Sequence, residues 1–131
     1  MLHFFINLIV LLLCAVLIGF ERQKTHGIVG VRSITLLMLG AFVFSYISTR
    51  IGGDPSRVVA QVVSGVGFIG AGLVFKKDVD KIANVTTAIL IWSLAALGCL
   101  IGLGFLIEGV VITIIVYLVL KYYKKLFKDG N

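Results

Sequence analysis

The sequence predicts an all-α integral membrane protein, on two observations. Of the 131 residues, 60% are hydrophobic and only 14% are charged, whereas soluble chains are roughly a quarter charged. The apolar residues also form runs long enough, at ~1.5 Å per helical residue, to cross roughly 30 Å of hydrocarbon. A soluble domain of this length would have too small an interior to bury so much apolar surface.

Five transmembrane helices are expected within a single domain, 1–131. The first apolar run has neither the basic start nor the cleavage site of a signal peptide, so it is interpreted as a helix that stays in the membrane. The region 82–120 contains one charge, Glu108, and is too long for a single crossing. Its glycines place a turn around 102–108, although the boundary between the last two spans stays open. The expected spans are 2–20, 33–51, 55–75, 84–101 and 105–120, followed by a basic tail, 121–131.

The distribution of positive charge predicts the orientation. With five spans, the first link, the third link and the tail share one side of the membrane and carry ten of the twelve basic residues. Arg50 and Arg57 lie on the other side. Because basic residues favour the cytoplasmic side, the N-terminus is expected outside and the C-terminus in the cytoplasm. The ten are Arg22, Lys24, Arg32, Lys76, Lys77, Lys81, Lys121, Lys124, Lys125 and Lys128.

The segment 54–72, DPSRVVAQVVSGVGFIGAG, is predicted to be the closely packed central helix of the bundle. Asp54 is placed to cap it, with Pro55 at the first helical position. Residues 65–70 match the pattern GxGxxG, but no strand precedes them, which excludes a dinucleotide site. Small residues instead predict close helix contact. Ala60, Ser64, Gly67 and Ala71 form a stripe of small residues along one face, and Gly98 and Gly102 could offer a matching notch on the fourth span. The predicted packing residues are Ala60, Gly65, Gly67, Gly70, Ala71, Gly72, Gly98 and Gly102.

Polar residues near the predicted membrane surfaces have two interpretations. Gln61 and Ser64, one turn apart and close to Asp54 and Arg57, either form interhelical hydrogen bonds or line a polar pocket in the outer half of the bundle. Thr86 and Thr87 near the inner end of the fourth span are equally ambiguous. No carboxylate is expected at mid-membrane, where a cation-coupled transporter commonly has one.

Other function classes find little support. His3 and His26 stand alone, and no nucleophile, metal-ligand or paired-carboxylate spacing is present, so we expect no enzyme, no metal site and no cofactor. Cys14 and Cys99 lie inside apolar runs and are interpreted as packing residues. The net charge of +6 lies in links and a tail rather than on a soluble basic face, which disfavours nucleic acid as a partner.

Four blocks in this order carry a family resemblance: GFERQ at 19–23, GVRS at 30–33, the segment 54–72, and VTTAILIWSLAALG at 85–98. Together they resemble the MgtC/SapB family of bacterial membrane proteins. The resemblance implies a multi-pass inner-membrane protein linked to magnesium limitation and virulence, and contact with the ATP synthase. Longer members have a soluble C-terminal domain, so this chain is expected to be a membrane-only form. The residues that fall in the family's blocks, without assigned roles, are Glu21, Arg22, Arg32, Asp54, Arg57, Gln61, Ser64, Thr86 and Thr87.

Two functional hypotheses follow. The first is a non-enzymatic regulator that contacts other membrane proteins, or copies of itself in a homo-oligomer, within the lipid bilayer. The second is a small oligomeric transporter of an ion or solute such as magnesium or protons, with Asp54, Arg57 and Gln61 lining its outer vestibule.

Overall fold

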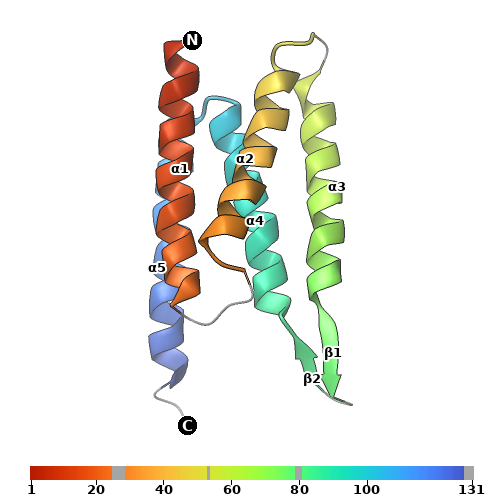
Figure 1. The fold of residues 1–131 in the computed structure, drawn as a ribbon, viewed down its shortest axis with the longest axis vertical. Coiled ribbons are helices and arrows are strands. Elements are labelled where there is room, and N and C mark those ends of the chain that lie inside the picture. The colour runs from red at the N-terminus through yellow and green to blue at the C-terminus, as the bar shows by residue number, and fades with distance from the viewer. Residues whose placement is uncertain (25–28, 53, 79–80, 129–131) are drawn as a thin grey trace.

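The described chain forms a bundle of five helices whose axes run in nearly the same direction (Figure 1). The computed structural model describes residues 1–24, 29–52, 54–78 and 81–128. For 75–78, 81–83 and 123–128 it describes the backbone only. Successive helices are antiparallel, so the N-terminal and C-terminal ends lie at opposite ends of the bundle. The helices are α1 (Leu2–Gln23), α2 (Val31–Ser48), α3 (Pro55–Leu73), α4 (Val85–Gly102) and α5 (Leu106–Lys128).

Four of these helices, α1 to α4, are long and apolar enough to cross a membrane within the described residues. Their outer faces carry many exposed large apolar side chains, among them Leu13, Phe44, Phe68 and Trp92. Such surfaces are compatible with hydrocarbon rather than water. The chain is therefore a multi-pass membrane protein. The fifth crossing, by α5, and the orientation of the bundle stay predictions.

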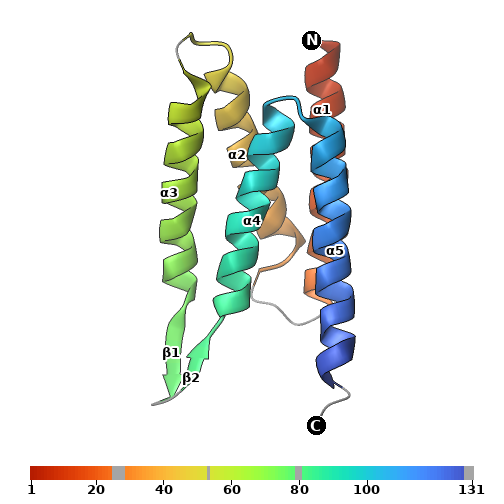
Figure 2. The same cartoon turned by 180° about the vertical axis from the view of Figure 1, so that it is seen from behind.

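The centre of the bundle is α4, which contacts each of the other four helices. More than half of its membrane window is buried, compared with 11% for α3. Figures 1 and 2 show α2 and α4 between α3 on one side and the pair α1 and α5 on the other. The prediction that 54–72 is the central helix was therefore wrong. Small residues along a helix allow close contact, but they do not show that the contact lies inside the same chain.

The close approach of α2 and α4 occurs over two glycines of α4. A Cβ added at Gly98 would lie 2.5 Å from the Met38 carbonyl oxygen, and one added at Gly102 would lie 2.6 Å from the Phe42 carbonyl oxygen. Any side chain at these positions would push the two backbones apart. Gly98 and Gly102 thus face α2, and not α3 as the proposed notch would require.

The predicted ends of the helices differ from the observed ends by a few residues. The turn expected around 102–108 is confirmed, since α4 ends at Gly102 and Gly104 has a φ of +98°. The last helix continues into the predicted tail as far as Lys128, because lysine favours helix and no proline or glycine interrupts 110–128.

The third helix ends at Leu73, two residues before the predicted end. The chain then forms a short antiparallel pair, β1 (Phe75–Asp78) and β2 (Lys81–Ala83), which the all-α prediction did not include. At the end of α3 the Asn84 side-chain amide donates a hydrogen bond of 3.2 Å to the Leu73 carbonyl oxygen. This bond satisfies one of the carbonyl groups that a helix end leaves unpaired.

Candidate functional site

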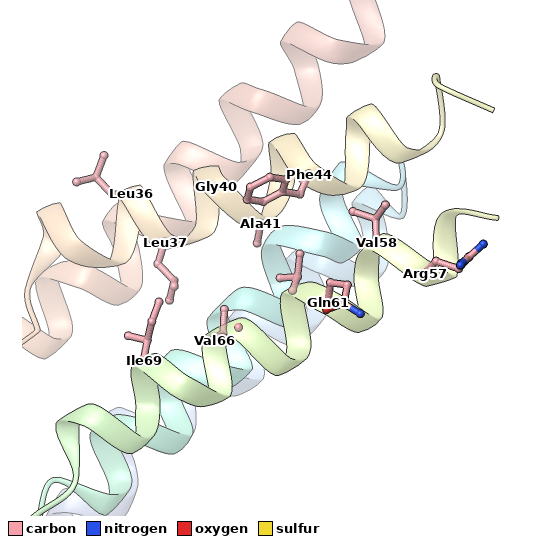
Figure 3. A pocket seen from close by; sticks show the side chains of 12 residues that line it. Leu36, Leu37, Gly40, Ala41, Phe44, Arg57, Val58, Gln61, Val66 and Ile69 are labelled. Carbon is pink, nitrogen blue, oxygen red and sulfur yellow. The ribbon is translucent and has the colours of Figure 1, made fainter. Parts of the chain in front are cut away.

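A groove of about 720 Å³ lies between α2 and α3 (Figure 3). Within the described residues, α3 packs more extensively against α4 than against α2, which leaves space between α2 and α3. Its two walls come from one face of each helix. The lining residues are Leu36, Leu37, Gly40, Ala41, Phe44, Arg57, Val58, Gln61, Val62, Gly65, Val66 and Ile69.

Two glycines on opposite walls keep the groove open. Gly40 belongs to α2 and Gly65 to α3, and a Cβ added at either would meet no atom within 4 Å. Large apolar side chains line the rest of the walls, and Leu37 and Ile69 point toward one another at the end far from the start of α3 (Figure 3). The groove is therefore apolar over most of its length.

The groove has one polar end, at the start of α3. Arg57 and Gln61 lie there one turn apart, and both are exposed. Within the part of the chain that the structure describes, the Arg57 side chain makes no hydrogen bond or ion pair. Arg50 is engaged elsewhere, with its guanidinium carbon 4.4 Å from the centre of the Tyr46 ring, and that ring packs against Phe4 of α1. Arg57 is thus the cation that lines this groove.

Asp54 caps α3 as predicted from its position before Pro55. Its carboxylate accepts a hydrogen bond of 2.9 Å from the Ser56 backbone N–H and one of 2.6 Å from the Ser56 hydroxyl. Both bonds favour the charged carboxylate, and the hydroxyl bond is the larger cause, so the pKa of Asp54 lies below its ordinary value. Asp54 does not line the groove.

The small residues predicted to pack along α3 are mostly exposed, and Gly67 and Ala71 border a second hollow between α3 and α4. Ala60, Ser64, Gly67 and Ala71 are all exposed, and Val66 and Gly70 are the buried residues of the helix. A Cβ added at Gly67 or Gly72 would meet no atom within 4 Å, whereas one at Gly70 would lie 3.6 Å from the Ala88 carbonyl oxygen of α4. Most of the small face of α3 is thus not used inside this chain.

The remaining predicted polar residues lie at the opposite end of the bundle, where α1 ends and α2 and α4 begin (Figure 1). Here the Arg22 guanidinium donates a hydrogen bond of 2.8 Å to the hydroxyl oxygen of Thr87, which is buried. This bond joins α1 to α4. Glu21 lies 3.7 Å from the ammonium group of Lys24, while Arg32 and Thr86 are exposed. The nine predicted residues therefore form two separate sets, and Arg57 and Gln61 are the members that line the groove.

Sequence reasoning missed the groove itself. The sequence does not show which helix faces lie opposite one another. Gly40 and Leu37 are ordinary residues of an apolar run, so nothing in the sequence marks them as lining a groove. The sequence predicted a polar entrance of Asp54, Arg57, Gln61 and Ser64, of which Arg57 and Gln61 line the groove; its apolar continuation depends on how α2 and α3 are placed relative to one another.

A comparison with protein-family models matches residues 8–128 to the model of the MgtC family. The chain belongs to the MgtC family. Among relatives of this MgtC-family chain, a Brucella abortus (strain 2308) protein named "Protein MgtC" is 43% identical over 102 residues, or 76% of this chain and 42% of that protein. A Salmonella typhimurium (strain 14028s / SGSC 2262) protein with the same name is 37% identical over 88% of this chain and 50% of its own length.

A third relative of this MgtC-family chain, from Escherichia coli (strain K12), has the name "Putative magnesium transporter YhiD". It is 36% identical over 134 residues, which cover 95% of this chain and 62% of that protein. The chain spans about half the length of the curated relatives that it matches. No solved structure matches the chain.

Proposed function

We propose that this MgtC-family protein acts in the bacterial inner membrane as a non-enzymatic regulator, by lateral contact with other membrane proteins or with copies of itself. The observation that supports the proposal is the outward face of α3. Its small residues at 60, 64, 67 and 71 are exposed, and the membrane window of the helix is only 11% buried.

This face suits a second helix for a physical reason. In lipid, apolar contact alone does not hold helices together, since lipid tails are as apolar as leucine. Close backbone approach over small residues supplies packing contacts that lipid cannot match. The same chain already uses this device where Gly98 and Gly102 meet α2. The small face of α3 offers a second surface of this kind.

The proposal includes a partner and a setting. The partner would be the ATP synthase or a second copy of the chain. The protein would act under magnesium limitation and in virulence, as the family resemblance implies. It also includes five spans with the N-terminus outside. Support for the fifth span comes from α5, which lies beside α1 and runs in the same direction (Figure 2).

The test is a leucine placed on the small face. In Gly67→Leu, a bulky side chain should hold a neighbouring helix away and weaken assembly by about tenfold, which corresponds to roughly 1.4 kcal/mol. Assembly is measured by crosslinking and by oligomer size in detergent, with the ATP synthase present and absent. The matched control is Gly65→Leu, the same change on the same helix but within the groove. Unchanged assembly in Gly67→Leu would exclude contact through this face.

A small oligomeric transporter of magnesium or protons is the second candidate. It is favoured by the name of the Escherichia coli relative and by the polar entrance at Arg57 and Gln61. Within the residues that the structure describes, no three His, Cys, Asp or Glu side chains are grouped to hold a metal ion. Flux of magnesium or protons into proteoliposomes that contain the purified chain tests this candidate. Flux that Asp54→Asn abolishes would favour the transporter, and no flux under any gradient would favour the regulator.

A further inference from the structure

The groove between α2 and α3 differs from the small face of α3 in both shape and chemistry. It is lined mostly by large apolar side chains, with the exposed Arg57 and Gln61 at one end (Figure 3). Gly40 and Gly65 leave open space between its walls, and most of the other lining side chains are large and apolar. Its volume of about 720 Å³ lies in the range of roughly 300–1,000 Å³ that is typical of sites for small molecules.

The length of the groove matches one leaflet of a bilayer. On α3 it extends from Arg57 to Ile69, and twelve steps of ~1.5 Å give about 18 Å. Half of the roughly 30 Å hydrocarbon core is about 15 Å. Since α3 begins at one end of the bundle and continues only four residues beyond Ile69, the groove runs from the membrane surface to somewhat beyond the middle of the bilayer. A partner helix would instead contact the bundle through both leaflets.

The polar end of the groove lies where a lipid has its polar groups. Arg57, in the first turn of α3, is at the level of a phosphate, and its fork of N–H donors suits phosphate oxygens. Gln61, one turn deeper, has an amide N–H₂ that can donate to an ester carbonyl oxygen. Asp54, the acidic residue nearest in sequence, accepts its hydrogen bonds from Ser56 and stays outside the groove.

We propose that this groove binds one anionic phospholipid, with an acyl chain between α2 and α3 and its phosphate at Arg57. The lipid enters sideways from the bilayer, because α3 lies at the edge of the bundle. The bound lipid fills the space between α2 and α3. This site is separate from the small outward face of α3, so either proposal can fail without the other.

The test uses the purified chain in phosphatidylcholine vesicles with a trace of phosphatidylglycerol or phosphatidylcholine that carries a nitroxide on its acyl chain. Electron paramagnetic resonance measures the fraction of lipid held immobile by the protein. The wild-type chain should hold phosphatidylglycerol about fivefold more strongly than phosphatidylcholine, the difference expected for one arginine at an anionic headgroup. Arg57→Gln should remove this preference and leave the chain folded.

The second part of the test fills the groove with larger side chains. Gly65→Leu should reduce the immobile fraction of both lipids, and Gly40→Leu should do the same from the opposite wall, since neither position has an atom within 4 Å of an added Cβ. The matched control is Gly67→Leu, which lies outside this groove and should hold lipid as the wild type does. Soluble glycerol 3-phosphate in excess should not displace the labelled lipid, because the acyl chain supplies much of the binding.

Four results would overturn the proposal. One is equal retention of the two lipids by the wild type. Another is an unchanged immobile fraction in both Gly65→Leu and Gly40→Leu. The third is loss of oligomers in these two variants with lipid retention unchanged, which would assign the groove to a second copy of the chain. Displacement by glycerol 3-phosphate would likewise replace the lipid site with a simple phosphate site.

Discussion

At the residue scale, Asp54 links a turn to the first helical residues of α3. Its carboxylate accepts both hydrogen bonds that Ser56 donates, so the cap depends on the carboxylate being charged. The Arg22–Thr87 hydrogen bond has a comparable role at the other end of the bundle, where it joins α1 to α4. Both interactions lie near helix ends, where unpaired backbone groups and charged side chains meet the membrane surface.

The Asp54 cap predicts a pH dependence of stability. Because the folded-state pKa of Asp54 is lowered, its stabilisation is present above the pKa of the unfolded chain and is lost as pH falls through the folded value. Asparagine caps a helix about as well and does not titrate. Asp54→Asn should therefore match the wild type near neutral pH and lose less stability in acid.

Thermal unfolding in detergent between about pH 7 and pH 3 measures this difference. Other carboxylates also titrate in this range, so the informative quantity is the gap between variant and wild type at each pH. Parallel curves would show that the Asp54 charge does not contribute to the cap.

At the scale of the element, α4 is apolar on every face, as expected of a helix surrounded by others. Its ten buried residues include Thr87, Leu94 and Gly98. In contrast, α3 has two buried residues and presents its small residues to the outside. The two helices show that the same residue type, glycine, serves an internal contact in one and an open surface in the other.

This contrast predicts different effects of alanine at two glycines. Gly98→Ala should lower the free energy of unfolding by about 1–3 kcal/mol, because its Cβ would lie 2.5 Å from the Met38 carbonyl oxygen. Gly40→Ala on the neighbouring helix should be neutral or slightly stabilising, since its Cβ meets no atom within 4 Å and alanine favours helix. Denaturant unfolding in micelles compares them, and equal losses would contradict the close α2–α4 contact.

At the scale of the whole molecule, antiparallel succession of the helices places the end of α1 and the start of α3 at opposite ends of the bundle (Figure 1). With the N-terminus outside, as the basic residues predict, the start of α3 is exposed outside and the end of α1 in the cytoplasm. The groove of α2 and α3 would then open toward the outer leaflet.

Thiol labelling tests this orientation. Ser56 and Gln23 are both exposed, whereas the native Cys14 and Cys99 are buried and should label slowly. A membrane-impermeant maleimide added to intact spheroplasts should modify Ser56→Cys at once and Gln23→Cys only after permeabilisation. The reverse result would invert the orientation, and labelling of both from one side would contradict the antiparallel arrangement.

The sequence alone determined the membrane class, the places of the five helices and the family, because these depend on apolar run length, on local breaks such as Pro55 and Gly104, and on four blocks of residues. The Asp54 cap was also predictable, since a cap is a local contact. The nine candidate polar residues were chosen from the four family blocks, and the structure places them at the two opposite ends of the bundle.

Only the tertiary structure decided which helix lies at the centre and where the groove forms. A stripe of small residues has the same sequence whether it contacts a neighbouring backbone, as Gly98 does, or borders open space, as Gly67 does. The groove depends on two faces from separate spans, α2 and α3, that lie side by side only in the folded chain. Such facts arise from the relative placement of helices, which the pattern along one apolar run does not encode.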